Sequence, residues 1–431
     1  MGADPKTADV PAVAPFDHHA PDWAADWPGV TSRLRDQCPV ARTDAHGGYW
    51  LVTGYDEAMA IAMGAEFMSG RVNGESSYFV PSMPLPLIPL ESDPPVHTKL
   101  RRTLNPIFTE RMADLWEPFI RQATDALVDP HIASGRIDLL TDLSRRVTAT
   151  VNLALVGLVE LAATAEQVDR FVTAPGIVAR EKAGSPAYLE AIAATEEMDD
   201  VVRQLIRDRR RAPRDDVATV VAHIELEGDD ETVEATRVRL IQNLVAGGNA
   251  TTTSLIAHGL MWLSEHPAER AELIAEPGRL ESAVEEFIRF YSPAHCVGRR
   301  AREDAEVAGA TIPAGERVIL CFAAANRDER AIERANEVLL DRGAQQRHLA
   351  FGYGRHRCIG RYFARTTARV VIGRLLERMP DYRVHVDEVV HYTDVASVNG
   401  IHSMPASFTP GRPTGAAMPS DCPPLPDKVK V

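Results

Sequence analysis

One cysteine stands in a setting that could make its sulfur a metal ligand. Cys358 follows the glycine-rich stretch HLAFGYGRHRC, which begins at His348, and a helical pattern extends from it to Arg378. Backbone N–H groups at the start of a helix favour a negatively charged sulfur and lower the pKa of a thiol. Glycines around the cysteine let the backbone approach a flat group closely. These glycines are Gly352, Gly354 and Gly360.

Basic residues stand directly before this cysteine. Arg355, His356 and Arg357 could donate hydrogen bonds to carboxylates. A thiolate, room for a disc and nearby donors together fit haem, since a cysteine thiolate is one of the axial ligands of haem iron. A cysteine after a loop is otherwise most often a small buried residue. The spacing F-G-x-G-x-H-x-C-x-G, which starts at Phe351, favours a haem ligand over an ordinary buried cysteine.

This spacing resembles the haem-ligand loop of the cytochrome P-450 superfamily. The resemblance implies that Cys358 is the axial iron ligand of a haem b group, and that Phe351, Gly352 and Gly360 also contact the haem. Further segments resemble the same family in order from about residue 48 to 405. EEFIR, with Glu286 and Arg289, resembles its E-x-x-R helix motif, and FAAANRDER resembles its A-N-R-D segment. For both segments the resemblance implies a structural role.

Four residues are implied to face the haem propionates. DPPVHTKLR resembles the start of a family helix, which implies this role for His97 and Arg101. GRRARED resembles the strand that carries a further propionate arginine. That arginine falls on Arg299, and the register makes Arg300 the less favoured choice. His356 is implied as another donor, and the alternative for each residue is an ordinary surface base.

The longest helical pattern runs over residues 231–265. Its middle, LVAGGNATTTSLIAHGLMWL, is apolar on most sides, which is typical of a core helix. Each of its two adjacent glycines costs the helix about 1 kcal/mol. Either a bulky group approaches or deforms the backbone there, or another helix packs closely. The family pattern [AG]-G-x-[DE]-T-[TS] aligns with Gly247 to Thr252. Thr251 then falls on the family threonine that supports oxygen activation, with Gly248 and Asn249 in the same catalytic segment.

The acid that precedes this threonine in the family is replaced by Ala250, which cannot relay protons. Waters, Asn249 or another acid could compensate, or the chain uses a different proton supply. Fungal P-450 nitric oxide reductases read A-G-N-A-T here, and some members that couple or rearrange substrates also lack the acid. Neutral variation is a further interpretation, since Thr251 is kept.

The resemblance implies a haem-thiolate monooxygenase that activates dioxygen and oxidises a small or medium hydrophobic molecule, as in secondary metabolism. Thiolate ligation favours O–O cleavage. No G-x-G-x-x-G unit is present, so electrons are expected from a separate ferredoxin or flavodoxin with its reductase. One alternative is nitric oxide reduction, oxidative coupling or rearrangement without the acid–threonine relay. A second alternative, from another functional class, is a haem-binding or haem-sensing protein that catalyses no reaction.

Two surfaces could serve partners and substrate. Lys99, Arg101, Arg102 and Arg111 form a basic cluster that either docks an acidic redox partner or is a solvated helix face. By family position the substrate pocket is lined by residues 69–90, 245–248, 294–297 and 398–401, mostly small or apolar. Three residues could read a polar substrate group, or be ordinary polar residues: Arg71, His295 and Asn399.

Composition argues against several kinds of partner and metal site. Among 431 residues, 47 are Lys or Arg and 61 are Asp or Glu, a net charge of −14 that disfavours nucleic acid as a partner. The cysteines are scattered, which argues against a disulfide framework and a zinc ribbon. They are Cys38, Cys296, Cys321, Cys358 and Cys422. With no secretory signal and no apolar run of about 18 residues, we expect a cytoplasmic monomer without a membrane span.

We expect a mainly helical chain with smaller β-sheets (α+β), folded as one large haem-enclosing domain over residues 21–409. Residues 1–20 are expected to form a flexible tail, and the Pro-rich residues 410–431 a disordered one. Within the domain the sequence predicts a strand and helix from Gly48, an irregular loop over 76–95, and helices from about 110 to 290, the last over 280–291. Strands are predicted over about 297–322.

Overall fold

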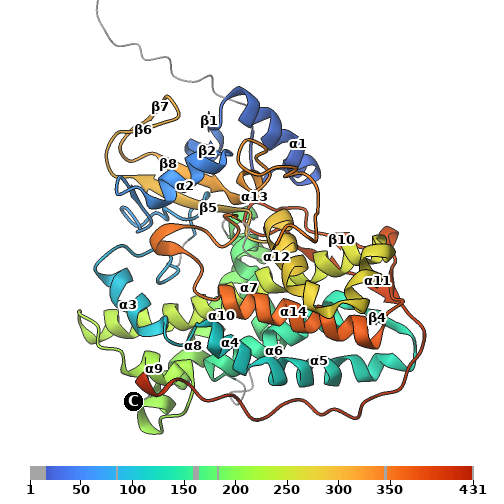
Figure 1. Ribbon diagram of the computed structural model, residues 1–431. Helices are drawn as coiled ribbons and strands as arrows, with labels where there is room; N and C mark the ends of the chain where they lie inside the picture. The colour runs from blue at the N-terminus through green and yellow to red at the C-terminus, as the bar shows by residue number, and fades with distance from the viewer. Residues whose placement is uncertain (1–15, 84–85, 159–164, 182–183, 344–346, 430–431) are drawn as a thin grey trace, which may run out of the picture.

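The computed structural model describes residues 16–83, 86–158, 165–181, 184–343 and 347–429. The helices are α1 (Pro21–Gln37), α2 (Tyr55–Met63), α3 (Val96–Leu104), α4 (Glu110–Leu115), α5 (Glu117–Ile132), α6 (Arg145–Val156), α7 (Ala165–Arg180), α8 (Pro186–Arg211), α9 (Val217–His223), α10 (Asp230–Glu265), α11 (Pro267–Ala275), α12 (Leu280–Tyr291), α13 (Phe322–Ala325) and α14 (Arg361–Arg378). The strands are β1 (Val40–Thr43), β2 (Tyr49–Val52), β3 (Phe67–Met68), β4 (Arg136–Asp138), β5 (Cys296–Ala301), β6 (Ala305–Val307), β7 (Ala310–Ile312), β8 (Arg317–Cys321), β9 (Arg383–Val384), β10 (Val390–His391), β11 (Ile401–Ser403) and β12 (Pro405–Ser407). Figure 1 shows a helical half around α10 and a sheet-rich half that carries α1 and α2.

Helix α10 is the axis of the helical half. It contacts α6, α7, α8, α9, α11, α12 and α14 (Figure 1). Its N-terminus is capped by Asp229, whose side chain accepts a hydrogen bond from the Thr232 amide. The helix is buried on most of its sides between Val238 and Leu263, as its apolar sequence requires. The predicted helix over 231–265 is therefore confirmed, with one more residue at its start.

The two adjacent glycines of α10 have different surroundings. A Cβ at Gly248 would overlap the side-chain amide of Asn152 on α6. That amide donates to the Leu244 carbonyl at 3.1 Å, so Gly248 serves close helix packing. A Cβ at Gly247, in contrast, would meet no atom within 4 Å. Close packing thus explains the second glycine but not the first.

The largest sheet has the strand order β1-β2-β8-β5-β3. Strands β2 and β8 pair in parallel, whereas the other neighbours are antiparallel. Successive residues of a strand point to opposite faces. On β8, Val318 and Leu320 join one hydrophobic cluster while Ile319 and Cys321 join another, so both faces of the sheet are buried. The predicted strands over 297–322 are confirmed by β5 to β8.

The long proline-containing loop leads into α3. Its described residues, 76–83 and 86–95, contain no helix or strand, as predicted, while residues 84 and 85 lie outside the described residues. Helix α3 begins at Val96, directly after Pro95. The helix predicted over 280–291 is likewise confirmed by α12.

Both terminal segments differ from the expected loose tails where the structure describes them. Near the N-terminus, Phe16 and His18 are buried, while residues 1–15 lie outside the described residues. The C-terminal segment runs under α5 toward α9 (Figure 1). Leu425 is buried in the helical core. A proline-rich composition disfavours regular elements, and the described part of this segment forms only the short 3₁₀ helix Asp427–Val429. Such a composition does not prevent an extended segment from packing.

A carboxylate on α5 holds this C-terminal segment. Asp129 accepts from the Thr414 amide and hydroxyl at 3.0 and 2.9 Å and from the Gly415 amide at 2.8 Å. The Arg378 guanidinium of α14 donates to it at 2.7 Å. Although partial burial opposes ionisation, these hydrogen bonds lower the pKa of Asp129. The anchor therefore retains its charge well into the acidic range.

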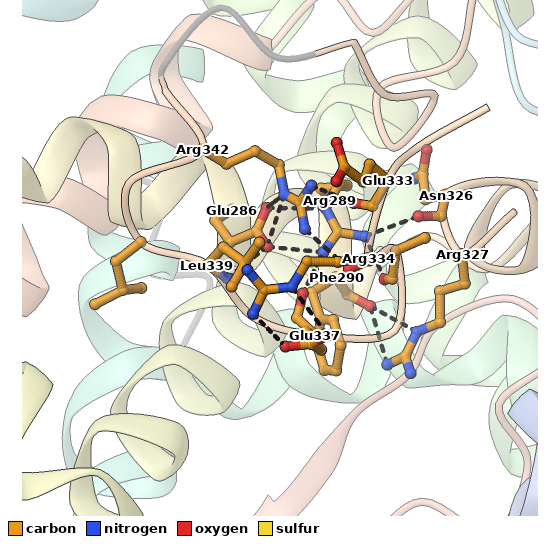
Figure 2. A network of polar contacts seen from close by, with 12 residues as sticks. Glu286, Arg289, Phe290, Asn326, Arg327, Glu333, Arg334, Glu337, Leu339 and Arg342 are labelled. Atoms are coloured by element: carbon orange, nitrogen blue, oxygen red, sulfur yellow. Dashed lines mark hydrogen bonds and ion pairs between the residues drawn. The ribbon is translucent and has the colours of Figure 1, made fainter. Parts of the chain in front are cut away.

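A buried arginine joins α12 to the chain that leads toward Cys358 (Figure 2). Arg289 forms a two-point ion pair with Glu286 at 2.7 and 2.8 Å, and both side chains are fully buried. Its remaining N–H groups donate to the carbonyls of Asn326, Ala335 and Glu337. All five donors of the guanidinium are thus satisfied, which compensates for burying the charge.

We expect Arg289→Met to lower the free energy of unfolding by about 3–5 kcal/mol, because it leaves the Glu286 carboxylate buried without its main partner. Arg334→Met is the matched control, since Arg334 pairs with Glu337 at 2.6 Å but both side chains are more than half exposed. The control should cost less than about 1 kcal/mol. Denaturant unfolding followed by circular dichroism measures both. Equal losses in the two variants would contradict a special role for the buried pair.

Candidate active site

Cys358 lies in a loop rather than on a helix. The sequence predicts a helix from Cys358, but α14 begins only at Arg361. The Cys358 amide donates to the Phe351 carbonyl at 2.7 Å, which closes the loop. Burial raises the pKa of the Cys358 thiol, whereas the Gly360 amide and the Arg101 guanidinium lower it. The expected lowering of the pKa is therefore wrong, because burial outweighs the nearby donors and charges.

Two glycines make this loop possible. Gly352 and Gly354 have φ angles of 68° and 69°, in the left-handed region that favours glycine. A Cβ at Gly354 would come within 2.7 Å of the Ala62 carbonyl oxygen on α2. The loop can thus reverse its direction while it lies directly against α2.

Contacts from two other segments fix the start of the loop. The Asn326 side chain accepts a hydrogen bond from the Leu349 amide at 2.6 Å. Arg365 of α14 lies over the Phe351 ring at 4.5 Å and is bound by Glu285 of α12 at 2.6 Å. The E-x-x-R and A-N-R-D segments therefore hold the loop structurally. Sequence analysis missed Glu285, although it stands directly beside the glutamate of the E-x-x-R motif.

Histidine and arginine side chains from three elements gather beside Cys358. His97 lies on α3 and His356 in the loop, with ring centroids 4.2 Å apart. Burial, followed by the charges of neighbouring arginines, lowers the pKa of His97 to about 4 and that of His356 to about 2. Burial also lowers the pKa of Arg299 on β5 to about 10. The charges that act on these groups come from Arg101, Arg299 and Arg355.

Within the described chain, this cluster has little negative charge to balance it. Asp93 is the carboxylate that acts on both His97 and Arg299. Asp93 is itself engaged by Arg302 at 3.2 Å and by the Gly70 amide at 2.9 Å. Among the described residues, His356 Nε2 is buried without a hydrogen-bond partner. A group that brings carboxylates beside Cys358 would fit this arrangement.

The structure separates the two neighbouring arginines of β5. Arg300 reaches Glu75 at 3.2 Å and the Gly315 carbonyl at 3.2 Å. Arg299 is buried beside the cluster and donates to the Gly298 carbonyl at 2.6 Å. Because neighbouring strand residues point to opposite faces, only one of them can face the cluster. The preference for Arg299 agrees with this placement.

The residues predicted for catalysis lie in the middle of α10. The Thr251 hydroxyl donates to the Gly247 carbonyl at 3.0 Å. The Asn249 amide donates to the Val245 carbonyl at 2.6 Å, while its Oδ1 is buried without a partner among the described residues. A cavity of about 260 Å³ borders Asn249 and Ala250. Its polar lining includes Thr141, Arg146, Thr253 and Ser254.

Of the residues predicted to read a polar substrate group, Arg71 has polar partners within the fold, whereas both ring nitrogens of His295 are buried without a hydrogen-bond partner among the described residues. Arg71 binds buried Glu91 at 3.1 Å and the Met83 carbonyl at 2.7 Å. These contacts hold the proline-containing loop over residues 76–95 in place. His295 packs on Trp27 with ring centroids 4.6 Å apart, and burial lowers its pKa to about 3. The Asn399 carbonyl accepts a hydrogen bond from Ser254.

The basic cluster near α3 divides into two parts. Lys99, Arg102 and Arg111 are exposed, whereas Arg101 is half-buried and lies close to Cys358. Arg101 therefore belongs with the inner positive groups, and the other three belong to the surface. No helix in the described part of the chain is long and apolar enough to cross a membrane.

The family model named Cytochrome P450 matches residues 184–397. The chain is 32% identical over 403 residues to the cytochrome P450 monooxygenase PikC of Streptomyces venezuelae, a match that covers 91% of this chain and 94% of that protein. It is 30% identical to the pentalenic acid synthase of Streptomyces avermitilis, over 93% of this chain and 98% of that one. The structure of cytochrome P450 CYP268A2 from Mycobacterium marinum, in complex with pseudoionone, matches with a TM-score of 0.81 and 28% identity, over 93% of this chain and 100% of that one.

The helical fold with its small sheets and its cysteine loop is thus that of a haem-thiolate protein. The chain belongs to the cytochrome P450 family and is a P450 monooxygenase. This family implies a haem cofactor. The arginines beside Cys358, together with His356 Nε2, which has no partner among the described residues, fit such a cofactor, because haem carries two propionate carboxylates.

We expect Arg299→Ala to weaken haem retention at least roughly tenfold, because a buried charge-assisted hydrogen bond contributes about 1.5–3 kcal/mol. Arg300→Ala is the matched control, since its guanidinium already pairs with Glu75. Transfer of haem to apomyoglobin, followed by absorbance, measures the loss rate for each variant. A faster loss from the Arg300 variant than from the Arg299 variant would reverse the assignment.

Proposed function

We propose that this P450 binds haem b with the Cys358 thiolate as the axial iron ligand, and oxidises a small or medium hydrophobic molecule. The observation that carries the proposal is the cluster of arginine and histidine side chains beside the Cys358 loop, which has little negative charge against it within the described chain and leaves His356 Nε2 buried without a hydrogen-bond partner there. In the proposed arrangement His97, Arg101, Arg299 and His356 hold the propionates. Phe351, Gly352 and Gly360 contact the ring at the loop. When bound, the haem supplies reductive activation of dioxygen.

The proton supply is the point on which this chain departs from its family. Ala250 offers no acid, but the cavity beside it is lined by hydroxyl groups and by the unpartnered Asn249 oxygen. A buried water requires about two to four polar partners, and such groups provide them. We infer that ordered water in this cavity donates to Asn249 Oδ1 and holds protons next to Ala250. The Thr251 hydroxyl is the proposed donor on the haem side of α10.

Electrons are proposed to come from a separate ferredoxin or flavodoxin with its reductase. The exposed Lys99, Arg102 and Arg111 give a local positive surface on a chain with a net charge of −14. Acidic redox proteins would be attracted to that surface. The apolar substrate is proposed to lie near residues 245–248, 294–297 and 398–401, which include the buried Val245 and Val297.

The ligand assignment predicts a spectroscopic loss. Cys358→Ala should abolish the red-shifted absorbance band that a thiolate ligand gives to the reduced carbon monoxide complex. Cys422→Ala is the control, because Cys422 is an exposed thiol. An unchanged band in the Cys358 variant would refute the assignment. Loss of the band from both variants would indicate unfolding rather than loss of a ligand.

The proposed water supply predicts opposite results for two changes at one position. Ala250→Leu places a larger apolar side chain at the cavity, so we expect at least a roughly tenfold loss of product per electron, within the range typical of proton-transfer catalysis. Ala250→Asp provides the family acid and should keep product per electron within about twofold. Product and consumed NADPH are measured with a surrogate ferredoxin system.

A third variant separates water loss from local damage to α10. Ala149→Leu fills the same cavity from α6, and it should reproduce the loss seen with Ala250→Leu. If Ala250→Asp instead raised product per electron tenfold or more, the natural chain would lack an effective proton supply. That result would favour nitric oxide reduction, coupling or rearrangement as the native chemistry.

A further inference from the structure

Two cysteines outside the candidate active site lie side by side on neighbouring strands of the main sheet. Cys296 begins β5 and Cys321 ends β8, and the antiparallel register places them directly opposite one another. Both belong to the same hydrophobic cluster on one face of the sheet. Both are buried, with 9% and 0% of their surface exposed, and both are free thiols. The mechanism proposed above uses neither of them.

The position of this pair in the ladder brings their backbones close. At the far end of the same register, the Ala301 amide donates to the Glu316 carbonyl at 3.0 Å, so Ala301 lies at a hydrogen-bonded position of the ladder. The Gly298 amide, three steps along β5, donates away from β8 to the Tyr78 carbonyl at 2.9 Å, as the alternation requires. Hydrogen-bonded and non-hydrogen-bonded pairs alternate along an antiparallel ladder. The cysteines are five steps from Ala301 and Glu316, and therefore occupy a non-hydrogen-bonded position. Cα atoms are about 4.5 Å apart at such positions, which lies within the range that a disulfide spans.

The surroundings of the two sulfurs differ in a way that assigns them different roles. The two thiols influence each other, so that the interaction lowers the pKa of Cys321 and raises that of Cys296. The amides of Ala323 and Ala324 and the charge of Arg35 further favour a thiolate at Cys321. Cys321 therefore has the character of an attacking thiol, and Cys296 that of a resolving thiol.

We propose that Cys296 and Cys321 form a redox-active pair that hydrogen peroxide converts reversibly into a cross-strand disulfide. The Cys321 thiolate attacks one peroxide oxygen, the O–O bond breaks, and Cys321 becomes a sulfenic acid as hydroxide leaves and takes up a proton to form water. The Cys296 sulfur then attacks the Cys321 sulfur, and the sulfenic oxygen leaves as a second water with the Cys296 proton. In total, two thiols lose two electrons and two protons, and one peroxide becomes two waters.

The other cysteines do not share this arrangement. Cys38 is half-buried and its thiol donates to the Val40 carbonyl at 3.0 Å. Cys422 is exposed, and Cys358 belongs to the proposed haem site. Cys38 and Cys422 therefore serve as internal controls for general oxidation of thiols.

The test uses the purified holoprotein, first reduced with dithiothreitol and then freed of it. The protein is exposed to hydrogen peroxide in small excess, denatured with iodoacetamide, digested and analysed by mass spectrometry. We expect the peptide with Cys296 to be joined to the peptide with Cys321, and both to return as single alkylated peptides after dithiothreitol. Diamide, a thiol oxidant that does not depend on haem, should give the same link.

Single variants test the order of the two steps. In Cys296→Ala, peroxide should leave Cys321 as a sulfenic acid that dimedone traps, because no resolving thiol is present. In Cys321→Ala, Cys296 should stay a thiol and take up at least tenfold less dimedone. Cys38→Ala is the matched control and should form the same link as the natural chain.

The proposal fails if Cys38 and Cys422 are oxidised while the two peptides stay unlinked in the natural chain. This outcome is measured on the natural chain. The proposal can therefore be refuted even if one of the variants does not fold. Equal labelling of the two single variants would overturn the assigned roles. The outcome is also separate from the proposed monooxygenase reaction, because diamide oxidation requires neither substrate nor electrons.

Discussion

The five N–H donors of one buried guanidinium connect the parts of this protein that must meet at the cysteine loop. Arg289 binds Glu286 on its own helix and three carbonyls on the chain that follows α13 (Figure 2). One of those carbonyls belongs to Asn326, whose side chain accepts the Leu349 amide at the start of the loop. The position of the loop thus depends on a charge that is stable in the interior only with every donor used. A lysine, with three donors on a flexible stem, could not form the same set of contacts.

The second constraint is electrostatic. His97, His356 and Arg299 are held together in the interior, and burial lowers the pKa of each. The pKa of His97 in the fold, about 4, lies below the ordinary value of 6.5. The unfolded chain therefore takes up this proton first, and the contribution of His97 to stability without a cofactor falls as the pH drops from about 6.5 toward 4. In the proposed arrangement the haem propionates would oppose this effect, so cofactor binding would stabilise the fold.

Local sequence patterns predict the parts of the molecule that depend on short-range order. The helix over α10, the helix α12 and the strands β5 to β8 follow from apolar periodicity and turn residues. The cysteine spacing identified the family. The sequence did not indicate that burial would raise the pKa of Cys358, that Arg71 would bind Glu91, or that a cavity would adjoin Ala250. Each of these depends on contacts between segments distant in the chain, and no local pattern encodes them. The roles given to Thr251 and the propionate residues remain predictions.

The packing of the C-terminal segment has a consequence for the order in which the chain completes its fold. Leu425 fills a place in the helical core, and Asp129 holds Thr414 and Gly415 against α5. These residues are synthesised after every helix from α1 to α14, and domains generally fold as their chain leaves the ribosome. The surface of the helical half that they cover stays exposed to water until residue 425 has emerged. The helical half therefore cannot reach its final packing during synthesis of the helices themselves, because Leu425, and Val429 in the short 3₁₀ helix Asp427–Val429, complete apolar contacts of its core.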